Sequence, residues 1–298
     1  MIKVRRIGHA TFETPDLAKM IDYHTQVTGL TVASQDADRA FLASRTGQLA
    51  VELRRADHAK CSGLCFEVAA DEDFADMARR LTALGIKSDL RNDTAPGLGK
   101  VLAFEDPKGT TIEVFNEWKS LARNQPFNGV GVLKLGHLAF CVDDPKAISE
   151  FYAKVLGFKV ADWISDMFVF MRCNADHHTV NFIVGPHGRM HHVAFELRDA
   201  AHLHTSCDLL GEKDIKIVWG PVRLGPGHNV ATFHRNPDDQ VVEMFAELDQ
   251  MKDETLGYYD PRHWHKDHPQ RPKVWPESQG TQYVWGLPPT PEFLRARK

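Results

Sequence analysis

Two distant stretches of the chain share the same order of hydrophobic and polar residues. Ile7–Val32 (IGHATFETPDLAKMIDYHTQVTGLTV) aligns without a gap with Leu135–Val160 (LGHLAFCVDDPKAISEFYAKVLGFKV). In both, the apolar positions around Gly-His predict a short strand, and a proline-containing turn leads into the amphipathic spacing of a helix. Gly29 and Gly157 stand where a helix ends in the left-handed conformation. The chain therefore contains two copies of one module.

The repeat continues through two further pairs of segments. Cys61–Val68 (CSGLCFEV) matches His191–Leu197 (HHVAFEL), and each is followed by a helical stretch. Phe104–Phe115 (FEDPKGTTIEVF) matches His234–Phe245 (HRNPDDQVVEMF), each a turn followed by a strand. Each module thus reads as strand, helix and three further strands over roughly 120 residues.

The repeat divides the chain into two domains and a tail. We expect an N-terminal domain at 1–118 and a C-terminal domain at 131–250, joined through a linker at 116–130. Residues 251–298 have no repeat partner and are rich in proline, histidine and aromatic residues. This composition predicts an extended tail that packs on the second domain.

Composition narrows the class of protein. The 298 residues are 43% hydrophobic and 26% charged, with a formal net charge of −4, which is ordinary globular composition. No block of lysine and arginine occurs, which argues against a nucleic-acid partner, and no apolar run is long enough for a membrane span or a secretory signal. Five cysteines without metal-finger spacing predict reduced, mostly buried thiols in a cytoplasmic protein.

The repeat also marks a candidate metal site. Successive strand residues face opposite sides, so we expect only one of His191 and His192 to point inward. Three equivalent strand positions carry His9, Gly63 and Glu113 in the first copy and His137, His192 and Glu243 in the second. Only the second copy keeps two imidazoles and a carboxylate, the facial set typical of an Fe(II) centre that activates oxygen. Burying these groups unpaired costs several kcal/mol, and a metal ion removes that cost.

These residues resemble the vicinal-oxygen-chelate (glyoxalase/bleomycin resistance/dioxygenase) superfamily, and within it the two-domain type I extradiol catechol dioxygenases. The resemblance implies an α+β fold of two tandem domains, each a pair of βαβββ motifs whose curved mixed sheet encloses a cavity. It implies a metal-free N-terminal domain and a catalytic C-terminal domain, in which Fe(II), or alternatively Mn(II), is held by His137, His192 and Glu243. The implied reaction cleaves the ring of a small aromatic diol with O2, in a protein that forms homo-oligomers.

The same resemblance implies further features of the site. It points His192 toward the metal and leaves His191 on the other side, as a surface or supporting residue, and it places the tail 251–298 near the site. The run HTVNF assigns the acid–base role near the bound oxygen to His178. The chain departs from the family pattern at Leu224 and Phe233, where the family has a histidine and a tyrosine. We therefore expect His228 to act as a substitute donor, catalytic and substrate-binding, with Phe233 and Tyr258 as further substrate contacts.

Two alternatives remain open at this stage. One is a glyoxalase-like metal enzyme without oxygen chemistry, which commonly takes ligands from both modules, whereas Gly63 spoils the first set. The other is a weakly catalytic or non-catalytic homologue that binds an aromatic compound, which the two lost side chains favour and the three retained ligands oppose.

Overall fold

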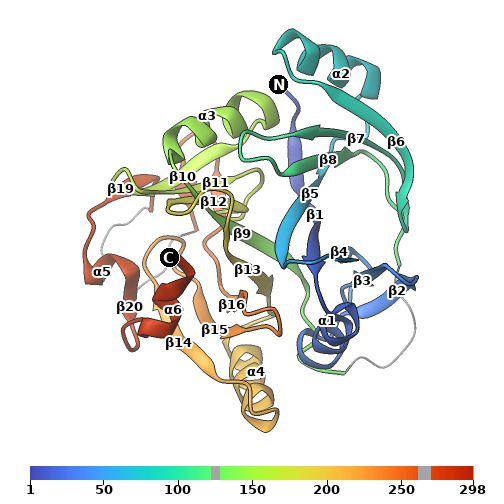
Figure 1. Cartoon of the computed structure of the whole chain (residues 1–298). Helices are drawn as coiled ribbons and strands as arrows, with labels where there is room; N and C mark the ends of the chain where they lie inside the picture. Colours follow the sequence, from blue (N-terminus) through green and yellow to red (C-terminus); the bar gives the residue numbers. More distant parts are fainter. Residues whose placement is uncertain (122–127, 261–269, 298) are drawn as a thin grey trace.

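The computed structural model describes residues 1–121, 128–260 and 270–297, and the repeat appears in it as two curved mixed sheets (Figure 1). Part of the expected linker and the tail segment 261–269 lie outside the described residues. The first module holds helices α1 (Leu17–Tyr23) and α2 (Phe74–Ala83) and a π-helical turn, η1 (His24–Thr28). Its strands are β1 (Val4–Thr14), β2 (Thr31–Gln35), β3 (Arg39–Ala43), β4 (Leu49–Arg55), β5 (Lys60–Val68), β6 (Ser88–Ala95), β7 (Leu98–Glu105) and β8 (Thr111–Phe115).

The second module repeats this order. Its helices are α3 (Pro145–Leu156) and α4 (Ala200–Glu212). Its strands are β9 (Lys134–Val142), β10 (Lys159–Ile164), β11 (Phe168–Arg172), β12 (Val180–Val184), β13 (Met190–Glu196), β14 (Ile217–Leu224), β15 (Val230–Arg235) and β16 (Val241–Ala246).

Strand order confirms the repeat and the fold class. The first sheet runs β2-β3-β4-β1-β5-β8-β7-β6, and the second contains the matching order β10-β11-β12-β9-β13-β16-β15-β14. Each module is therefore a pair of βαβββ motifs, whereas the hydrophobic pattern alone predicted a single strand-helix-three-strand unit and missed the other strands. Strands such as β11, where every residue is buried, lack the alternation that identifies a strand from sequence.

The tail adds strands to both edges of the second sheet. Its elements are β17 (Met251–Asp253), β18 (Tyr258–Tyr259), β19 (Lys273–Trp275), α5 (Gln279–Gln282), β20 (Tyr283–Trp285), α6 (Pro291–Leu294) and η2 (Arg295–Arg297). Strand β19 pairs with β10 at one edge and β20 pairs with β14 at the other, while α6 packs over the sheet between them (Figure 1).

Local sequence explains where the repeated helices begin and end. Asp144 caps α3, because its side chain accepts hydrogen bonds from two backbone amides of the first turn, and Pro145 occupies the first helical position. Asp16 caps α1 with a single such bond, from the backbone amide of Lys19. Gly29 and Gly157 end the two helical segments with φ of 77° and 75°, which confirms their expected left-handed conformation.

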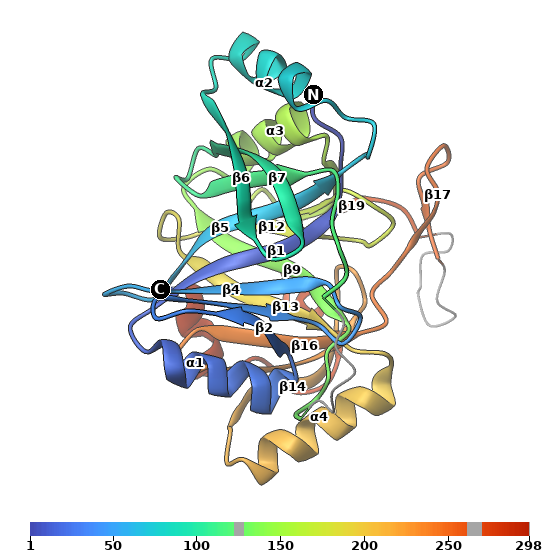
Figure 2. The ribbon, with the colours of Figure 1, turned by 90° about the vertical axis from the view of Figure 1, so that its right-hand side faces the viewer.

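The two modules contact each other through buried polar pairs as well as apolar side chains. Figure 2 shows α1 beside α4 at one end of the molecule and α2 beside α3 at the other. The hydroxyl of Tyr23 lies 2.7 Å from Nε2 of His234. At the other end, Tyr152 donates to Asp106 at 2.8 Å, and the fully buried ammonium of Lys108 lies 2.5 Å from the same carboxylate.

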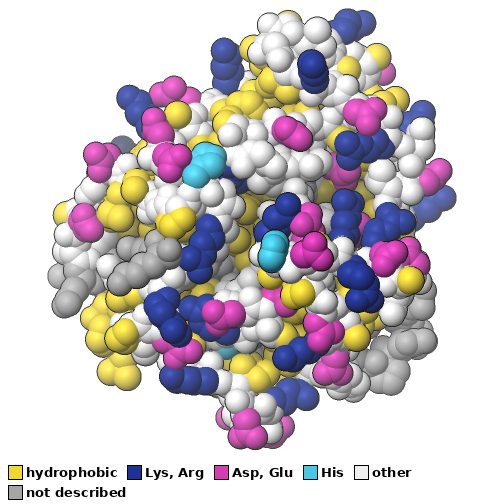
Figure 3. Space-filling view, viewed as in Figure 1, with side chains coloured by type: hydrophobic (Ala, Val, Ile, Leu, Met, Phe, Trp, Pro, Cys, Tyr) yellow, Lys and Arg dark blue, Asp and Glu magenta, His cyan; other side chains and the backbone are white. Residues whose placement is uncertain are grey.

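One face of the molecule, seen in Figure 3, gives little indication of a partner. Basic and acidic side chains interleave over the face seen in Figure 3 rather than forming a field of one sign. Among the described helices, none is long and apolar enough to cross a membrane. None of the five cysteines, all within the described residues, forms a disulfide.

Candidate metal centre and cavity

The three expected ligands converge on one point inside the second sheet. His137, His192 and Glu243 come from the neighbouring central strands β9, β13 and β16, and all three are buried. Nε2 of His137 lies 3.2 Å, and Nε2 of His192 3.3 Å, from the same oxygen, Oε2 of Glu243. One ligand atom from each residue lies within 4.8 Å of the others, which is the spacing of groups that share a metal ion.

The electrostatics of this group suit a divalent cation. Burial raises the pKa of the Glu243 carboxyl, but the imidazoles of His137 and His192 outweigh burial, so that its pKa falls below the usual range. An anionic carboxylate thus faces two imidazole nitrogens in a dry site, where a cation bound by all three would supply the missing positive charge. Two histidines and one carboxylate on one side of an ion leave its other side open for two further ligands.

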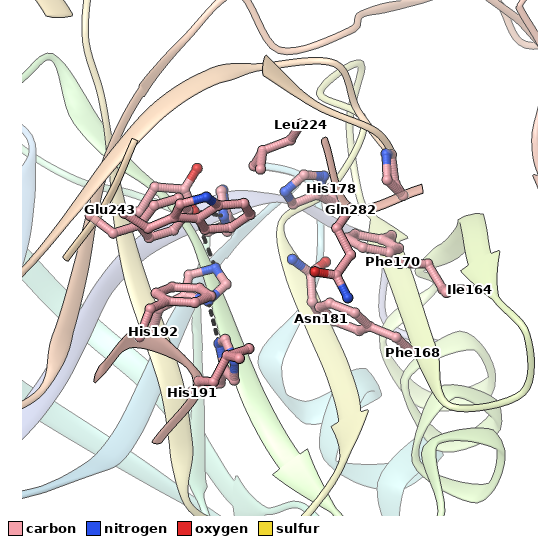
Figure 4. Close-up of a pocket in the computed structure, with 16 residues that line it drawn as sticks. Ile164, Phe168, Phe170, His178, Asn181, His191, His192, Leu224, Glu243 and Gln282 are labelled. Carbon is pink, nitrogen blue, oxygen red and sulfur yellow. Dashed lines mark hydrogen bonds and ion pairs between the residues drawn. The ribbon is translucent and has the colours of Figure 1, made fainter. Parts of the chain in front are cut away.

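A second layer of residues orients the ligands. The amide of Asn229, which is fully buried just before β15, donates to Oε1 of Glu243 at 2.8 Å and leaves Oε2 facing the two histidines. Nδ1 of His191 lies 2.7 Å from Nδ1 of His192, which turns Nε2 of His192 toward Glu243 (Figure 4). Such supporting contacts fix the rotamer and tautomer of metal ligands.

The expectation of a surface position for His191 was wrong, and its supporting role fits the structure. Its side chain is only 4% exposed and lines the cavity beside His192. The register between β13 and β9 shifts between Met190 and His192. An irregularity of this kind breaks the strict alternation of strand faces, so neighbouring histidines can share one side.

His178 also lies at this centre. Its ring centroid is 4.3 Å from that of His137, and it lines the cavity from the segment that precedes β12. Burial and the surrounding imidazoles hold its pKa well below the ordinary value, so the ring is neutral. A neutral imidazole beside the open side of a metal site can accept and return a proton.

A buried polar chain holds His178 from behind. Nδ1 of His177 lies 3.0 Å from Nδ1 of His178, and Nε2 of His177 lies 3.2 Å from a carboxylate oxygen of Asp162. Asp162 in turn accepts from the indole of Trp275 at 2.6 Å and from the backbone amide of Lys273 at 2.8 Å. The tail therefore fixes the chain that sets which nitrogen of His178 faces the cavity.

The cavity beside the ligands is mostly apolar. Its free space measures about 620 Å³, a volume that includes solvent at its open mouth. Its described lining includes no lysine or arginine. Besides the metal ligands, His178 and His191, it consists of Ile164, Phe168, Phe170, Asn181, Trp219, Leu224, Pro226, Phe233, Gln282, Phe293 and Leu294 (Figure 4).

The two positions that depart from the family pattern form part of this apolar wall. Leu224 and Phe233 both line the cavity. Phe233 is 2% exposed and stacks on Trp219, with ring centroids 5.1 Å apart and planes inclined by 17°. The ring of Phe293, from the tail, lies 4.9 Å from that of Phe233. An aromatic cluster therefore stands where the resemblance implies hydrogen-bonding side chains.

The structure does not bring the other two expected residues to the described cavity lining. His228 is buried in the turn before Asn229, with its Nδ1 2.7 Å from an oxygen of Asp249 and its backbone carbonyl accepting from Arg223 at 2.8 Å. Tyr258 lies on the short β17–β18 ribbon, with the guanidinium of Arg271 over its ring. His228 thus holds the loop that presents Asn229.

Sequence reasoning missed several residues of the site. Asn229 and Asp162 act through hydrogen bonds that span 14 residues or more, and Gln282 and Phe293 arrive from the tail. The repeat gave no signal for the tail residues, because the tail has no counterpart in the first module. For Asn229, the one signal in the sequence was its position next to His228, directly before a strand.

The fold and the convergent ligands define the class of protein. Both modules match the family model of the Glyoxalase/Bleomycin resistance protein/Dioxygenase superfamily, at residues 6–114 and 134–244, and the chain belongs to this superfamily. The expected superfamily is thereby confirmed.

Two relatives and one solved structure show which members of the superfamily the chain is similar to. The chain is 28% identical over 264 residues to a 3-methylcatechol 2,3-dioxygenase of Pseudomonas putida, covering 81% of this chain and 89% of the relative. It is 24% identical over 250 residues to a manganese-dependent 2,3-dihydroxybiphenyl 1,2-dioxygenase of Geobacillus genomosp. 3, covering 76% and 78%. Among solved structures, a Mn(II)-bound glyoxalase from Novosphingobium aromaticivorans superposes with a TM-score of 0.85 at 24% identity, covering 98% of this chain and 94% of the other.

Proposed function

We propose that this chain is a metal-dependent extradiol dioxygenase, which opens the ring of an aromatic vicinal diol with O2. The observation that carries the proposal is the convergence of His137, His192 and Glu243 beside an apolar cavity, with one side of the group open. The two curated relatives named above, both dioxygenases of aromatic diols, support the same reaction class.

His137, His192 and Glu243 would hold Fe(II) or Mn(II), and the bound ion would supply the one-electron chemistry that lets a diol react with O2. The two-histidine, one-carboxylate set favours Fe(II), and the manganese-dependent relative supports Mn(II) as the alternative. Asn229 and His191 keep the ligands in place.

The protein groups handle protons and exclude water. Because Nδ1 of His178 is engaged with His177, we assign proton transfer to Nε2, which accepts a proton from the substrate and returns it later. The rings of Phe168, Phe170 and Phe233 keep the cavity dry, which strengthens every electrostatic contact inside it.

Charge in the cavity defines the substrate class. A divalent ion with one carboxylate and neutral imidazoles carries a net charge of about +1, which a singly deprotonated diol would balance. A further carboxylate on the substrate would meet no lysine or arginine in the described lining. We infer an aromatic diol whose other substituent is uncharged and apolar, such as an alkyl group or a second ring, which would contact the wall that includes Trp219, Phe233 and Phe293.

Oxygen uptake tests this proposal. The metal-loaded protein is expected to consume O2 and form a coloured ring-opened product from an alkyl- or aryl-substituted catechol, and to turn over a carboxylate-bearing catechol at least about 10-fold less efficiently, because the uncompensated charge costs 1.4 kcal/mol or more. His192→Ala is the matched inactive control. No uptake with any diol by protein of full metal content would refute the proposal.

A glyoxalase-like reaction is the second candidate, because the superposed structure from Novosphingobium aromaticivorans is described as a glyoxalase. Product formation from a thiol-aldehyde adduct without O2, by protein that leaves catechols untouched, would favour this alternative. An assembly of copies of this chain stays a prediction, which light scattering on the eluting protein would test.

A further inference from the structure

The N-terminal module contains a second buried group of metal-ligating side chains. Ligand atoms of His9, Cys65 and Glu113 all lie within 4.8 Å of one another. The three side chains come from the central strands β1, β5 and β8 and are buried, at 1%, 2% and 9% exposure. The sequence reading treated this module as metal-free because Gly63 occupies the position of His192.

The repeat shows how a third donor returns to this group. In the second module, Glu243 lies directly across from Ala194 in the pairing of β13 with β16. In the first module, Glu113 lies directly across from Cys65 in the pairing of β5 with β8. Cys65 therefore takes the place of Ala194, two residues beyond Gly63 on the same strand, and offers a thiol where the second module has a methyl group.

The space at Gly63 explains why a histidine does not supply this donor. A Cβ atom at Gly63 would lie 3.0 Å from the hydroxyl oxygen and 3.2 Å from Cβ of Thr11. Thr11 cannot easily yield, because its hydroxyl donates to Glu52 at 2.8 Å and both residues are buried. The backbone at residue 63 thus stays without a side chain, and Cys65 is the residue of this strand that contributes a donor atom to the group.

We propose that the N-terminal module binds a second divalent cation of the thiophilic kind, such as Zn²⁺, through His9, Cys65 and Glu113. Imidazole, thiolate and carboxylate are the ligand types of zinc sites, and a thiolate favours zinc over hard cations such as Mg²⁺. On binding, the Cys65 thiol proton passes to solvent and a sulfur–metal bond forms, with no change in oxidation state.

The surrounding charges permit such an ion. Glu52 and Glu113 face Arg54 and Arg91, with Glu52 2.7 Å from Arg54 and Glu113 3.3 Å from Arg91. A cavity lined by Thr11, Gly63, Cys65 and Glu113 and by the partly exposed Arg54 and Arg91 provides a path from solvent to Cys65 and Glu113.

Cobalt(II) is the probe that separates this site from the catalytic one, because only the N-terminal group contains sulfur. Apoprotein titrated anaerobically with Co(II) is expected to bind about two ions per chain, with a near-ultraviolet sulfur-to-cobalt charge-transfer band from one of them. Cys65→Ala, which installs the residue found at the equivalent position 194, is expected to abolish the band and reduce binding to about one ion. Cys207→Ala, on helix α4, is the matched control and should change neither.

The catalytic site is followed separately in the same titration. His192→Ala should lose the other ion and keep the charge-transfer band, so a failure of the proposed dioxygenase function leaves this result unaffected. The proposal is overturned if wild-type protein shows no sulfur-to-cobalt band, or if Cys65→Ala keeps the band and the same number of bound ions.

Discussion

Asn229 offers the sharpest test of how the metal ligands are held. Its amide donates to Oε1 of the buried Glu243 at 2.8 Å. Asn229→Ala removes this bond and leaves that oxygen buried without the donor, while the carboxylate becomes free to rotate. A hydrogen bond to a charged group contributes about 1.5–3 kcal/mol, and loss of a partner that supports a ligand weakens metal binding about 10–100-fold. We therefore expect the Kd for Mn(II) or Fe(II) to rise by about that factor.

The assay is equilibrium competition between apoprotein and a chromophoric chelator under anaerobic conditions. Asn236→Ala is the matched control, because Asn236 lies past the other end of β15 and its amide bonds to Gln240 at 3.0 Å. That variant loses a bond within the β15–β16 turn and should keep the wild-type Kd. A Kd for Asn229→Ala within about twofold of wild type, in protein of unchanged melting temperature, would refute the supporting role of this amide.

Three further outcomes are expected. Phe233→Tyr combined with Leu224→His, which adds two donors to the apolar wall, should raise oxygen uptake with simple catechols about 10-fold or more, and no increase would mean that the substrate needs no donor there. Asp106→Ala leaves the ammonium of Lys108 buried and uncompensated, so urea denaturation should show that the free energy of unfolding falls by about 3–5 kcal/mol. An unchanged denaturation midpoint would contradict this expectation. Burial lowers the pKa of His234 to about 3, below its unfolded value, so protonation favours the unfolded chain and the free energy of unfolding should fall as the pH drops below about 6.5, by about 2 kcal/mol from this group at pH 5. His234→Gln should remove that part of the pH dependence, and an identical slope in both proteins would contradict the assignment.

The repeat carried most of what the sequence could predict. Because equivalent strands of the two copies occupy equivalent places, the alignment alone put His137, His192 and Glu243 on three central strands, and the structure brings them together. Strand alternation was less dependable, because the irregular register near Met190 places His191 on the inner side as well. Strict alternation of faces holds only for regular strands, and the sequence pattern does not show where the register shifts.

The hydrophobic pattern of the sequence could not predict the contacts between distant segments of the chain. The pairing of Asp162 with His177 depends on how two strands and a loop meet in space, and the tail joins this chain through Trp275. The thiol of Cys65 was read as an ordinary buried cysteine, since its nearness to His9 follows from the cross-strand register. Side-chain periodicity reports which face is apolar, and it does not report which polar groups on that face meet.

The placement of β19 and β20 on opposite edges of the ten-stranded sheet has a consequence for dissecting the protein. A fragment ending at residue 250 would bare the backbone amides and carbonyls of β10 and β14 together, and such open borders recruit strands from other molecules. The same truncation would remove Phe293 from the aromatic wall and expose the cavity to water. The second module is therefore expected to aggregate when it is expressed without residues 251–298, even though His137, His192 and Glu243 would still be present.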